Sequence, residues 1–141
     1  MALHKITPFI WFEKEAADAA KFYTTVFKNS RIISTNPIVT SFELEGLQIS
    51  AINGGPVYKL SPAFSLAVSC DTQEEIDYYW NTLTEGGQES MCGWLVDKFG
   101  LSWQVVPSVL PQLMNDPERS QKVIGAFMKM KKFNIQALLD A

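Results

Sequence analysis

The sequence predicts an α+β fold made of two tandem β-α-β-β-β units followed by a helical tail, because one pattern occurs twice along the chain. Residues 8–27 (PFIWFEKEAADAAKFYTTVF) align with residues 65–84 (SLAVSCDTQEEIDYYWNTLT) at an offset of 57 residues. Residues 41–52 align with residues 95–106 at an offset of 54. Each copy opens with an apolar run and continues as an amphipathic stretch that ends in paired aromatic residues. Weakly similar repeats of this length indicate duplicated structural units.

The chain has 141 residues, 47% of them hydrophobic, which is typical of one globular domain with a sizeable core. We therefore expect a single domain over residues 1–141. The first unit covers about 5–55, the second about 62–107, and the helical tail about 108–141. Together the two units are predicted to form a cupped sheet.

The first copy contains the signals for one helix and four strands. Ile6–Phe12 is short and rich in β-forming residues, as a strand should be. Residues 15–28 place their apolar side chains on one helical face. Gly46 marks a tight hairpin turn between the last two strands. The three strands after the helix are predicted at Arg31–Thr35, Ile38–Glu45 and Leu47–Asn53.

The second copy repeats these signals and adds helix caps. Thr72 and Glu75 have the spacing of a capping box, and Gly86-Gly87 ends the helix. In the tail, Asp116-Pro117 predicts the start of a helix, and Asn134 predicts the cap of a last helix through Leu139. The second copy's later strands are predicted at Gln88–Cys92, Trp94–Lys98 and Leu101–Val106.

Charge, hydropathy and cysteine content exclude several classes of protein. The net charge of −3 argues against nucleic acid as a partner, because phosphate neutralisation needs a basic face. No segment approaches the roughly 20 apolar residues of a membrane span. The N-terminus lacks a signal peptide, and the two cysteines form neither a disulfide framework nor a metal-spacing motif. We therefore expect a cytoplasmic protein with no membrane partner.

Four motifs carry a resemblance to a known family. They are ITPFIWF, EAADAAKFYTTVF, CGWLVDKFGLSWQVVP at 92–107 and the closing MKMKKFNIQALLDA. With them the sequence resembles the PhnB-like family, also called 3-demethylubiquinone-9 3-methyltransferase-like, of the vicinal oxygen chelate superfamily. The resemblance covers nearly the whole chain. It implies the glyoxalase/bleomycin resistance fold, a small-molecule ligand in the cup of the sheet, and a homodimer.

The resemblance also places the positions that hold a metal ion in the metal-using members. They fall on Pro8 or neighbouring Thr7, Ser50, Ser65 and Gln104, and the repeat pairs Pro8 with Ser65 and Ser50 with Gln104. A catalytic zinc site needs about three ligands such as histidine or carboxylate. Proline has no side-chain donor, serine hydroxyls are poor ligands, and Gln104 offers one neutral oxygen. We therefore predict no metal and no other cofactor.

Strand alternation extends this set to a predicted ligand site. If Ser50, Ser65 and Gln104 face the cup, then other side chains two residues away face it too, and Phe9 and Trp11 lie under the helices. Such a site is half apolar and half neutral, which suits an apolar or aromatic ligand. The predicted ligand-binding residues are Ile10, Phe12, Gln48, Ser50, Ile52, Ser65, Trp94 and Gln104.

Several roles stay open at this stage. Gln104 could orient a ligand or satisfy a buried backbone group, and Trp94 could stack on a ligand or pack within the sheet. Asp97, just before the Gly100 turn, fits a turn-stabilising carboxylate better than a general base.

The sequence favours a metal-independent small-molecule-binding protein and identifies no catalytic residue. The alternative is an enzyme: a methyltransferase, as the family's label suggests, or a metal-dependent isomerase or lyase with atypical ligands. No Gly-rich strand-to-helix turn is present to hold an S-adenosyl cofactor.

Overall fold

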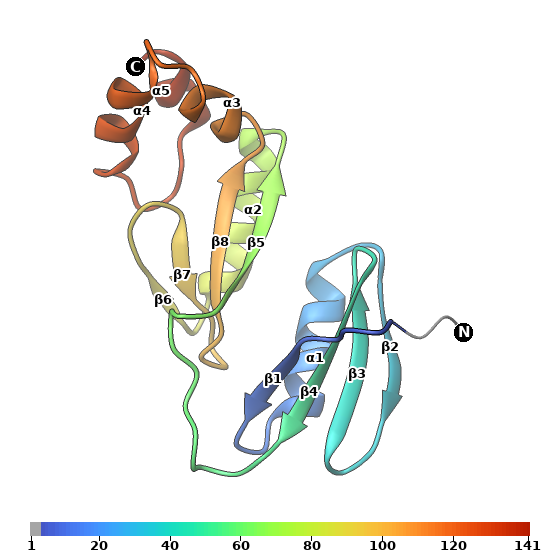
Figure 1. Cartoon of the computed structure of the whole chain (residues 1–141). Helices are drawn as coiled ribbons and strands as arrows, with labels where there is room; N and C mark the ends of the chain where they lie inside the picture. Colours follow the sequence, from blue (N-terminus) through green and yellow to red (C-terminus); the bar gives the residue numbers. More distant parts are fainter. Residues whose placement is uncertain (1–3) are drawn as a thin grey trace. The chain divides into compact units, whose positions relative to one another are not determined.

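A computed structural model describes residues 4–141, and the chain divides into two compact units, Met1–Leu60 and Ser61–Ala141. Each unit contains one four-stranded sheet and one helix packed on it (Figure 1). The element order confirms the two tandem β-α-β-β-β units and the helical tail. The expected single domain stays a prediction.

In the first unit, the first and last strands along the chain lie side by side in the sheet. The strand order is β1-β4-β3-β2, with β1 parallel to β4 and the other pairs antiparallel. Helix α1 connects β1 to β2, and its buried side chains, Tyr23 among them, pack on one face of the sheet. The elements are β1 (Phe9–Phe12), α1 (Ala16–Val26), β2 (Ser30–Thr35), β3 (Val39–Leu44) and β4 (Leu47–Asn53).

The N-terminus of α1 is capped from another element. Glu15 at the N-cap position makes no capping side-chain bond. Instead the Asn53 side chain, at the end of β4, accepts a hydrogen bond from the Ala16 backbone N–H at 2.8 Å. Its amide nitrogen donates to the Pro37 carbonyl at 3.1 Å. One asparagine therefore satisfies a free helix N–H and fixes the end of β4 against α1.

The second unit repeats this arrangement with shorter middle strands. The order is β5-β8-β7-β6, with β5 parallel to β8. The strands predicted at Gln88–Cys92 and Trp94–Lys98 are shorter than expected. β6 is shorter because the N–H of Cys92 donates to Met130 of the tail. β7 ends at Val96 because Asp97 begins the turn, with its N–H donating to Leu101 and its carbonyl accepting from Gly100. The elements are β5 (Ser65–Cys70), α2 (Gln73–Thr84), β6 (Gln88–Glu89), β7 (Trp94–Val96) and β8 (Ser102–Pro107).

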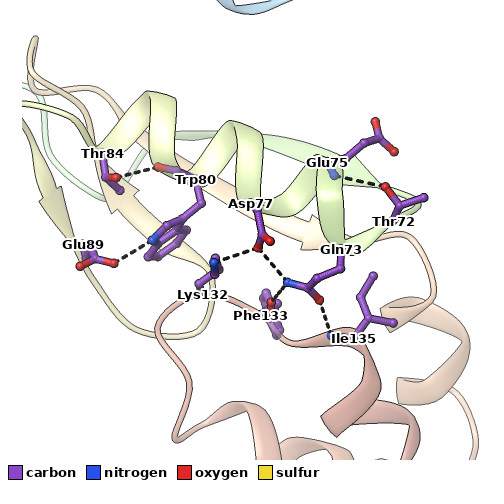
Figure 2. A network of polar contacts seen from close by, with 10 residues as sticks. All are labelled: Thr72, Gln73, Glu75, Asp77, Trp80, Thr84, Glu89, Lys132, Phe133 and Ile135. Carbon is purple, nitrogen blue, oxygen red and sulfur yellow. Dashed lines mark hydrogen bonds and ion pairs between the residues drawn. The ribbon is translucent and has the colours of Figure 1, made fainter.

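Helix α2 begins with the predicted cap. The Thr72 hydroxyl accepts a hydrogen bond from the Glu75 N–H at 3.2 Å. The Glu75 carboxylate reaches back to the N–H of Asp71, one residue earlier than in a standard capping box. On the buried side, the Trp80 indole N–H donates to Glu89 at 2.7 Å, which joins the helix to β6 (Figure 2).

The tail is tied to α2 through the side chain of Gln73 (Figure 2). Its amide nitrogen donates to the Phe133 carbonyl at 2.9 Å, and its oxygen accepts from the Ile135 N–H at 2.8 Å. Beside it, Lys132 lies 2.8 Å from Asp77. Hydrogen bonds from Lys132 and from Gln73 lower the pKa of the Asp77 carboxyl. The side chains of Gln73 and Asp77 on α2 thus hold the segment that leads into the last helix.

The tail forms three short helices, α3 (Leu110–Met114), α4 (Ser120–Phe127) and α5 (Ile135–Leu139). The predicted cap of the last helix is confirmed, since Asn134 accepts from the Ala137 N–H. Helix α4 begins at Ser120, later than Asp116-Pro117 predicts. Asp116 still makes the bonds of a cap, since its carboxylate accepts from the Glu118 N–H and its carbonyl accepts from the Ser120 N–H, both at 2.9 Å. Within residues 4–141, no helix combines the length and the apolar character needed to cross a membrane.

Asp97 is a structural carboxylate, as its place before the Gly100 turn predicts. It is 3% exposed and lies between β7 and β8. One oxygen accepts from the backbone N–H groups of Phe99 and Leu101, and the other accepts from the Trp103 indole at 2.8 Å. Its side chain therefore fixes both the turn and the largest buried ring of the second unit.

We predict that Asp97→Ala lowers the free energy of unfolding by about 3 to 5 kcal/mol, because it leaves buried donors without acceptors. Urea denaturation followed by tryptophan fluorescence measures the loss. Asp116→Ala is the matched control, because it also removes a carboxylate from a turn, but the hydrogen bond that it removes is exposed. It should lower the free energy of unfolding by about 1 kcal/mol or less. Equal losses in the two variants would contradict the structural role of Asp97.

Gly93 gives a second stability test, at the contact between β7 and the tail. Its φ is +81°, and an added Cβ would meet the Phe133 ring and lie 2.8 Å from the Val105 carbonyl oxygen. We predict that Gly93→Ala costs about 3 kcal/mol or more, from backbone strain plus overpacking. Gly46→Ala has the same sign of φ with open space around it, and should cost only about 1 kcal/mol. Thermal or urea unfolding of both variants distinguishes the two effects.

Candidate ligand-binding faces

We call the side of each sheet that points away from its own helix, α1 or α2, the open face. In the first sheet, register places Phe9 opposite Ser50 and Ser50 opposite Ser41. The two serine hydroxyls are 2.8 Å apart and share a hydrogen bond. Gln48 and Ile52 lie two residues either side of Ser50 on the same strand and share its face. Three of the predicted ligand residues are therefore together on this open face.

The face predicted for Ile10 and Phe12 is wrong. Their side chains are 1% and 3% exposed, whereas Phe9 is 58% exposed. Ile10 pairs with Ala51, which is fully buried on the α1 side of the sheet. Ile10 and Phe12 thus form the core under α1, and Phe9 and Trp11 occupy the open face.

A difference of one residue in loop length explains this error. Three residues separate Phe12 from α1, but only two separate Cys70 from α2. The offset of 57 therefore holds for the helices and becomes 58 for the strands before them. Because side chains alternate along a strand, a shift of one residue reverses every face. The corrected register aligns Thr7, rather than Pro8, with Ser65.

Trp11 is partly covered by the loop that follows β4. Its indole N–H donates to the Gly55 carbonyl at 2.9 Å, and its ring makes an edge contact with Tyr58 at 4.9 Å between centroids. Gly54 packs directly on the ring, where an added Cβ would clash. The Asn53-Gly54-Gly55-Pro56 loop therefore packs on a tryptophan and closes one end of the first open face.

The second open face carries the other predicted residues. Trp94 pairs directly with Gln104, and Ser65 lies diagonally from Gln104 across β5 and β8. The Gln104 amide nitrogen donates to the Ser65 hydroxyl at 3.0 Å. Gln104 thus bonds a side chain rather than a buried backbone group, and its carbonyl oxygen can accept from a ligand. Ser65, Trp94 and Gln104 form one partly exposed cluster.

A cavity of about 200 Å³ adjoins this cluster along β7. It is wholly within the second unit. The sequence analysis identified Trp94 but not the cavity, because its wall also includes the loop before β5. The lining residues are Pro62, Ser90, Trp94, Leu95, Val96 and Ser102.

The residues at the family's metal positions do not fit a divalent ion. Ser50 bonds Ser41, and Ser65 bonds Gln104, so these neutral groups satisfy one another. Thr7, which the corrected register substitutes for Pro8, offers one more neutral hydroxyl. Within residues 4–141, no three histidine, cysteine or acidic side chains are grouped as a metal site requires. We therefore derive no chemistry through a metal at these positions.

The two cysteine thiols differ in their surroundings. Cys70 is buried at the end of β5. Burial, and secondarily the charges of Glu75 and Asp71, raise the pKa of its thiol to about 12. A thiol in that state is not a nucleophile near neutral pH. Cys92 is partly exposed, and its sulfur lies 3.9 Å from that of Met128.

The corrected strand register makes a direct prediction. Ile10→Ala should lower the free energy of unfolding by about 2 to 5 kcal/mol, because it opens a cavity under α1. Phe9→Ala, the matched control on the adjacent position, should change it by about 0.5 kcal/mol, since the ring is mostly exposed. Chemical denaturation of both variants measures the difference. A larger loss of unfolding free energy in Phe9→Ala than in Ile10→Ala would support the strand faces predicted from the sequence.

Comparison with solved structures supports the fold. A PhnB protein from Bacillus cereus is 34% identical, with a TM-score of 0.70 over 74% of this chain and 99% of that chain. The FosX fosfomycin resistance protein from Listeria monocytogenes, solved with Mn(II) and sulfate, is 15% identical, with a TM-score of 0.58 over 86% of this chain and 98% of that chain. At that identity, FosX shows a likeness of fold alone.

The comparison with curated proteins found no match. A family model described as 3-demethylubiquinone-9 3-methyltransferase matches residues 4–106. The match includes all the strands except the last residue of β8, together with α1 and α2, and ends before the helical tail. The chain therefore belongs to this PhnB family.

Proposed function

We propose that the chain is a metal-independent small-molecule-binding protein whose ligand binds on the open face of the second sheet. The observation that carries the proposal is the cluster of Gln104, Ser65 and Trp94. It combines an amide, a hydroxyl and an aromatic ring beside a cavity of about 200 Å³. Binding sites typically have this composition, an apolar surface with a few convergent polar groups.

The polar groups of the proposed site are neutral. Gln104 can donate and accept, and the serine hydroxyls can do either, so the site matches ligand hydroxyl, carbonyl or amide groups. In the first unit, Gln48, Ser50 and Ile52 share their face with the Glu43–Arg31 ion pair, since Glu43 pairs with Gln48. On the second open face the cluster and the cavity lining carry no charge. A charged ligand there would lose its hydration without gaining an opposite charge, so a neutral apolar or aromatic ligand fits that face best.

The family's description names a methyltransferase, and this reaction is the alternative. Cofactor-binding folds that hold S-adenosyl groups use a Gly-rich turn between a strand and a helix. Here both strand-to-helix turns lack glycine, since they read Glu13-Lys14-Glu15 and Asp71-Thr72. Calorimetric titration with S-adenosylmethionine tests the alternative, and saturable micromolar binding would support it over the proposal.

We predict that a thermal-shift screen of neutral aromatic metabolites and antibiotics finds ligands that raise the melting temperature equally with and without EDTA. For such a ligand, Gln104→Ala should weaken binding about 5- to 20-fold, because it removes hydrogen bonds made at the site. Gln112→Ala is the matched control, because this glutamine is exposed on α3, and it should leave affinity unchanged.

The metal-dependent alternative has its own measurement. The protein is incubated with Ni²⁺, Zn²⁺ or Fe²⁺, desalted and analysed for metal. Stoichiometric, tightly held ion, or ligand binding abolished by EDTA, would refute the metal-independent proposal. Substoichiometric metal together with EDTA-resistant binding would support it.

The homodimer and the cytoplasmic location stay predictions. Size-exclusion chromatography with light scattering of the full chain measures the first directly. A mass twice that of the chain supports the homodimer, whereas the mass of one chain contradicts it.

A further inference from the structure

A buried hydroxyl beside the cavity along β7 has no hydrogen-bond partner among the described residues. Ser102 is 1% exposed and lines the cavity. Its Oγ makes no hydrogen bond to any group within residues 4–141. On the sheet it lies between Ser65 of β5 and Val96 of β7, so it is on the open face.

Such a hydroxyl calls for an explanation. Burial removes its water, and native proteins pair nearly all buried polar groups for that reason. Its neighbours use their own groups elsewhere, because Ser65 already accepts from Gln104. The Oγ is covered in the position shown, so it lies just behind the cavity wall. A rotation about its Cα–Cβ bond would turn it, as donor and acceptor, toward a molecule that enters the cavity.

The remaining walls define what that molecule can be. Pro62, Trp94, Leu95 and Val96 supply apolar surface, and no lining residue carries a charge. Apolar cavities of about 150 Å³ are large enough to bind benzene, and this one measures about 200 Å³. The space thus suits one six-membered aromatic ring with a small substituent, and Trp94 offers a ring for offset or edge-to-face contact.

We propose that this cavity receives the ring of a neutral aromatic ligand and that Ser102 Oγ hydrogen-bonds the ligand's hydroxyl or carbonyl group. The inference rests on the proposed function and deepens it by naming the ligand class and the residue that orients it. Ser102 then acts as a specificity residue, which distinguishes a phenol-like ring from a purely hydrocarbon ring of the same size.

The test uses phenol and toluene, two probes of similar size that differ by one hydroxyl. Each is titrated into the full-length protein, with NMR following the Trp94 indole and the Ser102 amide. Ser102→Ala should weaken phenol binding about 5- to 10-fold, as loss of one hydrogen bond implies. It should leave toluene binding within about twofold, because the apolar walls are unchanged.

Ser30→Ala is the matched control. Ser30 carries the other buried Oγ without a partner among the described residues, but it lies on β2 and not in the cavity. It should change binding of neither probe. An equal effect of the two substitutions on phenol would overturn the assignment to Ser102.

Stability of the free protein separates an orienting role from a structural one. Ser102→Ala removes no hydrogen bond made among residues 4–141, so its melting temperature should equal or exceed that of the unmodified chain. A clear fall would show that the protein itself uses the hydroxyl and would overturn the proposal.

The two proposals fail in different ways. If neither probe perturbs Trp94 or Ser102, or if phenol binds equally well to Ser102→Ala, the cavity inference is wrong. The proposed function still stands in that case if screened ligands bind in a manner sensitive to Gln104→Ala. If phenol binding depends on Ser102 but no metal-free ligand responds to Gln104→Ala, the cavity inference stands and the wider site is wrong.

Discussion

The parallel pairing of the first and last strands is the constraint on which each unit depends. β1 lies against β4, and β5 against β8, although a helix and two other strands separate them in the chain. A parallel connection requires a crossover, and the helix supplies it by packing across one face of the sheet. That packing fixes which side of the sheet is the core and leaves the opposite side for other contacts. Every candidate site residue is placed by this choice.

In the second unit, polar side chains have different roles on the two faces of the sheet. On its covered face, Asp97 accepts three hydrogen bonds and Trp80 donates to Glu89, so the polar groups there are paired. On its open face, Gln104 and Ser65 bond each other, while Ser102 stays unpaired beside a cavity. Residues of the same chemical types therefore have different roles according to which face they occupy.

The side chains on the open faces differ from those that a metal site requires, although the fold is like that of FosX, which was solved with Mn(II). Serines and one glutamine occupy the positions where a divalent ion would need imidazole or carboxylate groups. The first open face adds one ion pair, between Arg31 and Glu43, whereas the residues that line the cavity on the second are uncharged. A likeness of fold to FosX thus extends to the strand framework, and the chemistry of each protein is set by the side chains that the framework presents.

Much of the fold was predictable because its signals are local. The caps at Thr72 and Asn134 and the role of Asp97 before the Gly100 turn depend on residues a few positions apart. The repeat shows because the same local pattern occurs a second time along the chain. The predicted end of β6 was wrong because a residue distant in the sequence forms the hydrogen bond instead. Met130 accepts from the N–H of Cys92, a residue that was expected to belong to a strand, and no local pattern reveals that pairing.

By itself the sequence determined the two tandem units, their helices, and the neutral chemistry at Ser50, Ser65 and Gln104. Only the tertiary structure decided which face of β1 is buried, because a strand's two-residue period turns one extra loop residue into a complete reversal of its faces. Only it revealed the cavity along β7 and the unpaired hydroxyl of Ser102, since these depend on a loop, two strands and their register meeting at one place.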